Sequence, residues 1–211
     1  HTYYIPIFHE EYLDECLSEK IVTKYLKPVF EREDVTLIGH NLIFDLHVLC
    51  NMGINVVTPY IFDTMIACWM INENVLKKLE NLVKHYYGYN KYDLKQVLTT
   101  VPLSLRKEYG YGSTDFCCSI IEIPILGLYC MEDTYWSWKI HVDVLDELEE
   151  QKLETFFYEK YMYFNQVIFN MERRGVKVDI PALKKMQKMA EKDLEDLQYQ
   201  IYELAGIEFN V

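Results

Sequence analysis

The first 125 residues alternate short apolar runs with stretches in which apolar residues recur every three or four positions. Four runs rich in apolar, β-branched or aromatic residues predict strands: 3–7, 35–38, 54–57 and 60–62. Helices are predicted around them: one that follows the charged stretch 10–19 and ends near residue 30, one over 45–52, one over 63–70 and one over 76–86. Asp63 is expected to cap the third of these helices, and Gly88 to end the fourth. Pro6 places the first run at an edge or at the end of its strand. Strands that alternate with helices indicate an α/β domain.

Everything after residue 125 has helical periodicity. One side of the first predicted helix carries Leu126, Tyr129, Cys130, Asp133, Trp136 and Ile140. Two longer helical stretches follow; the first ends at Gly175, and the second begins at Asp179 and Pro181 and ends at Gly206. Their apolar stripes are typical of packing surfaces, so we assign them no chemistry. The segment 89–115 is rich in Tyr, Gly, Ser and Thr, and is predicted as loop with one or two short helices.

With half of its 211 residues hydrophobic, the chain can bury one sizeable core, or one core plus a helical appendage. Glu122 and Pro124 interrupt the longest apolar run, which stays far below the roughly 20 residues that a spanning helix needs. We therefore expect no membrane partner. The six cysteines lack a C-x-x-C pair and zinc-finger spacing, which indicates reduced thiols in an intracellular compartment, either the cytoplasm or an organelle.

The formal net charge of −12 narrows the range of partners. A protein that grips nucleic acid over a long footprint usually presents a basic face, and this charge argues against one. A nuclease that acts on a few nucleotides at a strand end through metal ions needs clustered carboxylates and little basic surface. The charge therefore argues against autonomous binding of duplex DNA, but not against metal-dependent chemistry at a strand end.

Two short patterns are candidates for chemistry: residues 40–45 after a predicted strand, and residues 129–133 within a predicted helix. Asp45 in the first pattern either caps the following helix or serves as a metal ligand. Tyr129 and Asp133 are four residues apart and share a helix face that otherwise carries core residues. A carboxylate that points inward needs a compensating salt bridge, proton or cation. Few lysines lie nearby in the sequence, which favours a divalent cation.

These patterns, in this order, resemble the proofreading exonuclease domain of family A DNA polymerases, the bacterial polymerase I type. Residues 4–7 look like the strand that follows the first exonuclease motif, and residues 41–45 look like the second motif. Residues 62–65 resemble the segment after the second motif. Residues 129–133, Tyr-Cys-Met-Glu-Asp, are similar to the third motif of the tyrosine type of DEDD exonucleases.

The tail resembles a neighbouring domain of the same family. Residues 171–179 and 205–211 are similar to the first part of the polymerase region. We therefore expect an RNase H-like exonuclease domain at 1–150, with a mixed sheet flanked by helices, followed at 151–211 by the all-helical start of the polymerase domain. The remainder of the polymerase chain is the expected partner that holds the duplex. An exonuclease of the ribonuclease D type shares the motif residues, and the polymerase-like tail argues against it.

The resemblance implies roles for five side chains. Two divalent cations, Mg²⁺ or Mn²⁺ and about 3.5–4 Å apart, would bracket the terminal phosphodiester at the single-stranded 3′ end of a DNA primer. Asp133 would ligate the cation that activates water, Asp45 would support the second cation, and Tyr129 would orient the attacking water. Asn41 would hydrogen-bond near the strand end, or stabilise its own loop. Tyr92 would stack on the terminal base, a contact worth roughly 1–3 kcal/mol, or be a plain surface residue.

One part of the family pattern is absent, because no Asp-x-Glu motif lies on a suitable predicted strand and Asp14-Glu15 in a polar stretch does not replace it. The motif is expected before Tyr3, and the chain, which starts at His1, reads as a fragment. With half of the metal cage, the chain alone is predicted to be inactive. Three interpretations remain: the parent protein has the motif, the domain is a degenerate exonuclease with a structural role, or the chain is a non-catalytic α/β binding module. The presence of both later motifs favours the first.

Overall fold

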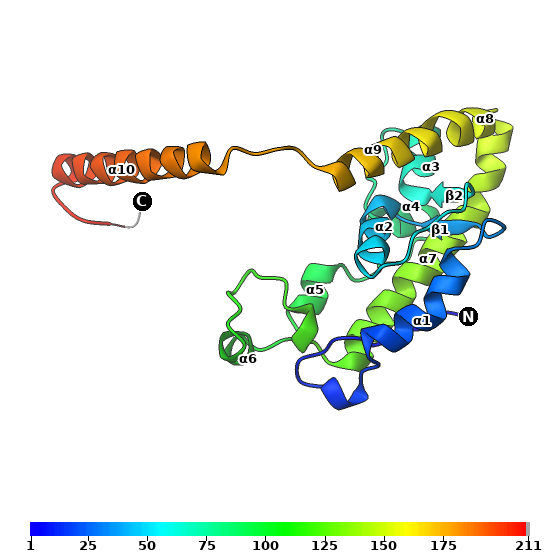
Figure 1. Ribbon diagram of the computed structural model, residues 1–211, viewed down its shortest axis with the longest axis horizontal. Helices are drawn as coiled ribbons and strands as arrows, with labels where there is room; N and C mark the ends of the chain where they lie inside the picture. The colour runs from blue at the N-terminus through cyan, green and yellow to red at the C-terminus, as the bar shows by residue number, and fades with distance from the viewer. Residues whose placement is uncertain (210–211) are drawn as a thin grey trace. The chain divides into compact units, whose positions relative to one another are not determined.

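The computed structural model describes residues 1–209, and the chain divides into two compact units, His1–Arg173 and Arg174 onward (Figure 1). The first unit contains a small sheet, one long helix and a set of shorter helices. The second unit is built around a single helix. All six cysteines are free. Within the described residues, no helix is long and apolar enough to cross a membrane.

Two short strands form the sheet of the first unit. β1 (Leu37–Gly39) pairs in parallel with β2 (Ile61–Asp63), and the register places Gly39 opposite Asp63. Parallel neighbours need a crossover connection, and α2 (Leu42–Asn51) provides it. The carboxyl ends of both strands therefore lie at the same edge, where side chains from the following loops can meet.

This parallel pair is the only ladder in the described part of the chain, so the predicted mixed sheet is not observed. The strands predicted at 35–38 and 60–62 are confirmed, slightly shifted along the chain. The strand predicted at 3–7 is wrong. Pro6 has no N–H to give to a ladder, and its carbonyl accepts the N–H of Leu17 at 2.9 Å.

The strand predicted at 54–57 is also wrong, because its backbone donors bond elsewhere. The N–H of Ile54 donates to the carbonyl of Leu49 at 2.9 Å, and the N–H of Asn55 donates to the carboxylate of Glu31 at 2.8 Å. Donors used in this way cannot join a ladder. Ile54 is nevertheless fully buried, so its apolar pattern reflects core packing without strand pairing.

The long helix α7 (Ile123–Glu150) forms much of the core of the first unit. Its residues Ile140, Val144 and Leu148 have no exposed surface and belong to one cluster with Phe62 of β2. Figure 1 shows α7 running through the unit, and it contacts β1 and several of the shorter helices. One face of α7 is thereby held beside the sheet, which matters for the site described below.

The helices predicted in the first half of the chain are confirmed. They are α1 (Glu19–Phe30), α2, α3 (Thr64–Ile71) and α4 (Leu79–Tyr87), and a 3₁₀ turn, η1 (Leu13–Glu15), precedes them. Asp63 caps α3 with its side chain, as the sequence predicts. Gly88 ends α4 with a φ of 66°, a left-handed conformation that favours glycine.

The loop region predicted at 89–115 is also confirmed, and its two short helices are α5 (Leu94–Leu98) and α6 (Leu103–Glu108); the 3₁₀ turn η2 (Cys118–Ile120) follows it. A second, smaller cluster of buried residues organises it. The buried guanidinium of Arg106 donates to the carbonyl oxygens of Val101 at 3.3 Å and Ser113 at 2.9 Å, and also to that of Leu98. This region is therefore ordered by packing and by one internal cation rather than by regular elements.

The first compact unit continues beyond residue 150, where the sequence places the end of the exonuclease domain. It includes α8 (Glu154–Phe156), the π-helical turn η3 (Phe157–Met162) and most of α9 (Tyr163–Arg174). Phe157 and Met162 are buried in the same cluster as Phe62, which explains why this stretch belongs to the first unit. The boundary between the functional domains remains a prediction.

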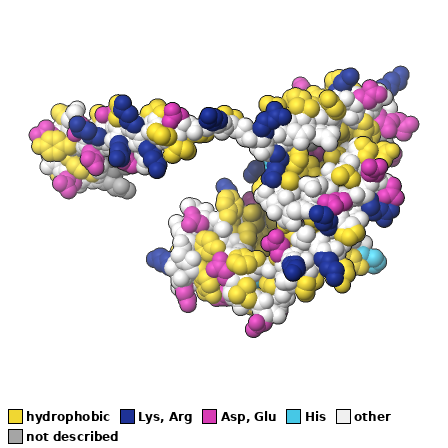
Figure 2. Space-filling model, viewed as in Figure 1, with side chains coloured by type: hydrophobic (Ala, Val, Ile, Leu, Met, Phe, Trp, Pro, Cys, Tyr) yellow, Lys and Arg dark blue, Asp and Glu magenta, His cyan; other side chains and the backbone are white. Residues whose placement is uncertain are grey.

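The second unit consists of α10 (Ile180–Ala205) with short flanking segments. The Asp179 carboxylate accepts the N–H of Ala182 at 3.0 Å, and Gly206 ends the helix with a φ of 69°, so both predicted ends are confirmed. No residue of α10 is buried. Figure 2 shows hydrophobic side chains on the visible face of this unit, among Lys, Arg, Asp and Glu.

Candidate active site

A cleft of about 910 Å³ lies beside β1 and α7. Its walls come from β1 and the loop after it, the start of α2, the segment that leads into α4, and one face of α7. Four of the residues singled out in the sequence line it: Asn41, Asp45, Tyr129 and Asp133. The fold therefore brings the two short patterns together. Tyr92 lies outside this lining and is 64% exposed.

The buried carboxylate of Asp63 fixes the loop between β1 and α2. It accepts the backbone N–H groups of Asn41 at 3.0 Å, Leu42 at 2.8 Å and Met65 at 2.9 Å. The first two lie at the start of α2 and the third at the start of α3, where helices leave N–H groups without partners. Asn41 has a φ of 60°, a left-handed conformation that asparagine tolerates better than most residues. The backbone thus places Asn41 at the cleft.

Asp45 lies in the first turn of α2 and does not cap this helix, because Asn41 holds the cap position. The capping interpretation of Asp45 is therefore wrong. Asp45 is an exposed residue, yet its pKa is raised to about 6. The larger cause is the loss of water around its carboxyl group, and the negative charges of Asp63 and Asp133 add to it. Carboxylates crowded in this way favour a proton or a cation beside them.

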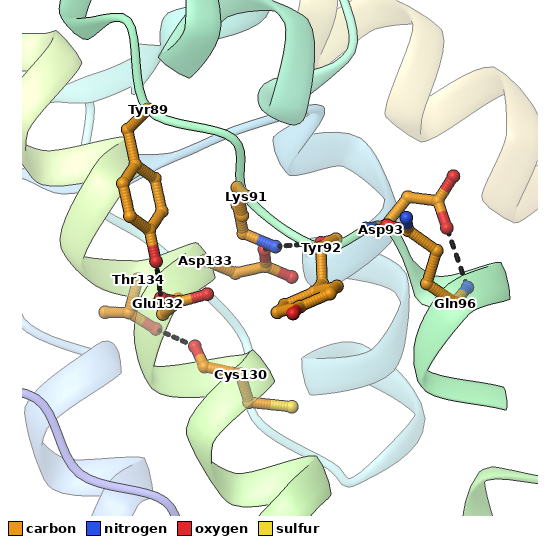
Figure 3. Close-up of polar contacts among 9 residues, drawn as sticks. All are labelled: Tyr89, Lys91, Tyr92, Asp93, Gln96, Cys130, Glu132, Asp133 and Thr134. Carbon is orange, nitrogen blue, oxygen red and sulfur yellow. Dashed lines mark hydrogen bonds and ion pairs between the residues drawn. The ribbon is translucent and has the colours of Figure 1, made fainter. Parts of the chain in front are cut away.

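The compensating group for Asp133 is Lys91. The Nζ atom of Lys91 lies 2.5 Å from Oδ1 of Asp133 (Figure 3). The Lys91 side chain is only 2% exposed, whereas that of Asp133 is 36% exposed. Of the three forms of compensation left open by the sequence, the structure contains the salt bridge. Sequence reasoning missed Lys91 because it is distant from Asp133 along the chain and lies on the irregular segment between α4 and α5.

Tyr129 is partly buried on the same face of α7 as Asp133. Burial raises the pKa of its hydroxyl well above the ordinary value, and the Asp133 carboxylate raises it further. The hydroxyl therefore stays protonated at neutral pH. In this state it can orient a water molecule by hydrogen bonding, but it does not act as a base.

His40 is a lining residue whose environment the sequence did not reveal. The Thr64 hydroxyl donates to the carbonyl of Gly39 at 3.0 Å, so its oxygen accepts the Nδ1–H of His40 at 3.0 Å. Burial lowers the pKa of His40 and outweighs the opposing effect of the Asp63 charge. The ring is therefore neutral near pH 7, and it ties the end of β1 to the start of α3.

Lys77 and Lys78 bring positive charge to the cleft. The Nζ atom of Lys77 lies 4.9 Å from the centroid of the Trp69 ring. The side chain of Lys78 is 73% exposed, and its Nζ atom lies 3.8 Å from the carboxylate of Glu80, which also lines the cleft. Exposed lysines at such a place suit contacts to phosphate groups. No sequence signal distinguishes these two from other surface lysines.

Asp45 and Asp133 are suitable ligands for a divalent cation, because hard cations such as Mg²⁺ and Mn²⁺ prefer carboxylate oxygens. Asp63 is not among the residues that line the cleft, and its two oxygens accept three backbone N–H groups, so we do not count it as a third ligand. Across residues 1–209, no group of three or more His, Cys, Asp or Glu side chains is arranged to hold a metal ion. The residues present therefore fit half of a four-carboxylate cage.

Comparison with known proteins identifies the family of the chain. A family model described as 3′–5′ exonuclease matches residues 4–149, which include all five predicted site residues. The chain belongs to this family, the 3′–5′ exonuclease domain of family A DNA polymerases. The resemblance found in the sequence is thereby confirmed, and the family is consistent with an RNase H-like fold, of which the described residues contain a parallel pair of strands.

The relatives are DNA polymerases. The chain is 31% identical over 211 residues to DNA polymerase I of Borreliella burgdorferi, covering 99% of this chain and 21% of that protein. It is 26% identical to DNA polymerase I of Chloroflexus aurantiacus, covering 99% of this chain and 21% of the relative. It is 25% identical to the DNA polymerase of Escherichia phage T5, covering 94% of this chain and 24% of the relative. The chain thus spans between a fifth and a quarter of the length of these relatives.

Proposed function

We propose that this chain is the exonuclease part of a DNA polymerase, and that it removes mispaired nucleotides from the 3′ end of a primer by metal-dependent hydrolysis. The observation that carries the proposal is the meeting of Asp45, on α2, with Tyr129 and Asp133, on α7, in one cleft. These are the residue types that a water-activating carboxylate site needs. Membership of the exonuclease family supports the same conclusion.

Asp133 and Asp45 would hold two divalent cations, Mg²⁺ or Mn²⁺, at the scissile phosphate. When bound, such cations lower the pKa of a water molecule and stabilise the leaving 3′ oxygen. Tyr129, which stays protonated, would hold the attacking water in line with the phosphorus through its hydroxyl group. The pKa of Asp45 is raised mainly by the loss of water around its carboxyl group and further by the charges of Asp63 and Asp133, and a bound cation would favour the ionised carboxylate.

The neighbouring side chains would position the strand end. Asn41 lines the cleft at the start of α2 and offers an amide for a hydrogen bond to the terminal nucleotide. Lys77 and Lys78 would contact phosphate groups. Tyr92, which is exposed, would stack on the terminal base. With a net charge of −12, the chain itself would hold only the single-stranded end, and the remainder of the polymerase would bind the duplex.

The complete cage requires two further carboxylates of the Asp-x-Glu pattern, which the described strands do not contain. The decisive assay therefore uses the complete gene product with a 5′-labelled primer that carries a 3′ mismatch, in Mg²⁺. We expect Asp133→Asn to lower the rate of 3′ nucleotide removal by about 10³-fold or more, because a metal ligand is lost. Asp146→Asn makes the same chemical change at an exposed position of α7 and is the matched control.

Equal rates for the two variants would rule out the proposed role of Asp133. That outcome would favour a second candidate, a degenerate exonuclease domain with a structural role. One observation supports this candidate. The charge of Lys91 already neutralises Asp133, and a purely structural site would need such neutralisation. Calorimetry separates the two, because a structural relic would release no heat on titration with Mg²⁺ or Mn²⁺.

A further inference from the structure

The ammonium group of Lys91 has a complete set of partners inside the protein. It forms the 2.5 Å ion pair with Oδ1 of Asp133 and donates to the carbonyl of Tyr92 at 3.0 Å. It also lies 4.0 Å from the centroid of the Tyr129 ring, within the range of a cation–π contact. A lysine that is 2% exposed is stable only when its charge is compensated in this way. Figure 3 shows its side chain pointing from the α4–α5 segment to Asp133 on α7.

The position of this ammonium group conflicts with a metal ion on the same oxygen. A divalent cation such as Mg²⁺ lies about 2.0–2.1 Å from a carboxylate oxygen. An ammonium nitrogen at 2.5 Å from Oδ1 of Asp133 would then lie within a few ångströms of the metal ion, and the two positive charges would repel each other strongly. Lys91 and a divalent cation therefore compete for Oδ1, and each weakens the binding of the other.

The segment that carries Lys91 is held mainly by side chains. Residues 89–92 lie between the end of α4 and the start of α5, and belong to no helix or strand. Tyr89 donates to the carboxylate of Glu132 at 2.9 Å and stacks on Trp136 of α7. Lys91 adds the second polar link from this segment to α7. A segment tied by side chains can give up one of these links while the helices on both sides stay in place.

We propose that Lys91 is an internal counter-ion of the cleft, which competes with a divalent cation for Oδ1 of Asp133 and must withdraw before the cation binds. This inference rests on the proposed function, since it assumes that Asp133 is a metal ligand. It adds a regulatory step: the segment that holds Lys91 and Tyr92 gives up its link to Asp133 when the cation arrives, while Tyr89 keeps its contacts with α7. Cation binding and the placement of Tyr92 are thereby linked.

The first test compares the Mn²⁺ affinity of the 211-residue chain with that of two variants, by calorimetry or by electron paramagnetic resonance of free Mn²⁺. Lys91→Met removes the competing charge and keeps the apolar stem. Lys78→Met removes the same charge from the same cleft, at a lysine that pairs with Glu80 and not with Asp133. We expect Lys91→Met to tighten Mn²⁺ binding by about tenfold or more, and Lys78→Met to change it by less than about threefold.

An affinity for Lys91→Met that equals or falls below that of Lys78→Met would overturn the proposal, because it would mean that the ammonium group stays in place and orients Asp133. Absence of Mn²⁺ binding in both the wild type and Lys91→Met would overturn it as well. Asp133→Asn distinguishes a failure of the counter-ion proposal from a failure of the proposed function. If Asp133→Asn abolishes Mn²⁺ binding while Lys91→Met matches the control, Asp133 remains a ligand and only the counter-ion role is lost.

A second measurement needs no variant at Lys91. Reductive methylation followed by mass spectrometry reports how accessible each lysine amine is in the wild-type chain. We expect Lys91 to react slowly without Mn²⁺ and several times faster with saturating Mn²⁺, whereas the exposed Lys78 serves as the internal reference. A Lys91 reactivity that stays unchanged when Mn²⁺ is bound would contradict the withdrawal step.

Discussion

Oδ2 of Asp63 accepts the backbone N–H of Leu42 at 2.8 Å, so the end of β2 holds the start of α2. Oδ1 of the same carboxylate accepts two further backbone donors, those of Asn41 and Met65. One buried side chain therefore fixes the loop after β1, the start of α3 and, through α2, the position of Asp45 in the cleft. Asp63 acts as a positioning residue beside the groups to which we assign chemistry.

Asp63→Asn tests this role. The amide keeps one acceptor oxygen but turns an NH₂ group towards backbone donors, so we expect the free energy of unfolding to fall by about 2–4 kcal/mol. Equilibrium unfolding in urea measures the change. Asp146→Asn, at an exposed position of α7, is the control and should shift stability by less than about 0.5 kcal/mol. Similar losses in the two variants would contradict the assigned role of Asp63.

Asp45 makes stability depend on pH. Its pKa is about 6 in the folded chain, against an ordinary value of 3.8, so the folded state binds this proton more tightly than the unfolded state. Between these two values the folded state carries more protons, and stability therefore falls as the pH rises. Asp45→Asn removes the charge and should stabilise the chain above about pH 6, by about 1 kcal/mol once solvent screening is allowed for.

Urea unfolding of the wild type and of Asp45→Asn, followed from about pH 4 to pH 8 in the presence of a chelator, checks this prediction. The difference should shrink towards the acidic end, where both folded and unfolded chains hold the proton. A stabilisation by Asp45→Asn that is the same across the whole range, or a destabilisation above pH 6, would show that folding does not raise the pKa of Asp45.

Tyr129→Phe separates orientation of water from metal binding. The variant keeps the ring that lies against Lys91 and removes only the hydroxyl group. We expect the complete gene product to remove the 3′ nucleotide about 100-fold more slowly, with an unchanged affinity for Mn²⁺. Tyr135→Phe, at an exposed tyrosine of the same helix, should leave the rate unaltered. A full rate in Tyr129→Phe would remove this hydroxyl from the mechanism.

The guanidinium of Arg106 is expected to stabilise the region around α5 and α6. Arg106→Met would leave the carbonyl oxygens of Val101, Leu98 and Ser113 without this donor, the first two in buried contacts, and lower the free energy of unfolding by about 2–4 kcal/mol. Hydrogen exchange should rise first in this region. Lys107→Met, its exposed neighbour, is the matched control. Uniform protection in Arg106→Met would mean that apolar packing alone holds the region.

The sequence predicts the helices and their caps well, because these depend on residues that are close together along the chain. The caps at Asp63, Gly88 and Gly206, and the helices that they bound, are confirmed because the neighbouring residues alone determine them. Strand pairing is a non-local property, so the apolar runs 3–7 and 54–57 are misread when their backbone groups bond elsewhere.

In the candidate site, too, the residues that belong to short motifs were predicted, and those that depend on the fold were missed. Asn41 and Asp45 come from one short motif, Tyr129 and Asp133 come from another, and the fold places both in the cleft. Lys91 was missed because its contact with Asp133 depends on how the α4–α5 segment crosses α7, which no spacing in the sequence encodes. The three hydrogen bonds that the Asp63 carboxylate accepts were missed for the same reason.

The proposed function requires Asp45 and Asp133 together to hold the cations of a nuclease site. Anomalous diffraction from crystals of the complete gene product soaked in Mn²⁺ shows whether they do. We expect anomalous peaks in the cleft, bonded to oxygens of Asp45 and Asp133, with Lys91 moved away from Asp133. A peak-free cleft at saturating Mn²⁺, or Mn²⁺ bound only elsewhere with the Lys91–Asp133 pair intact, would contradict the proposed function.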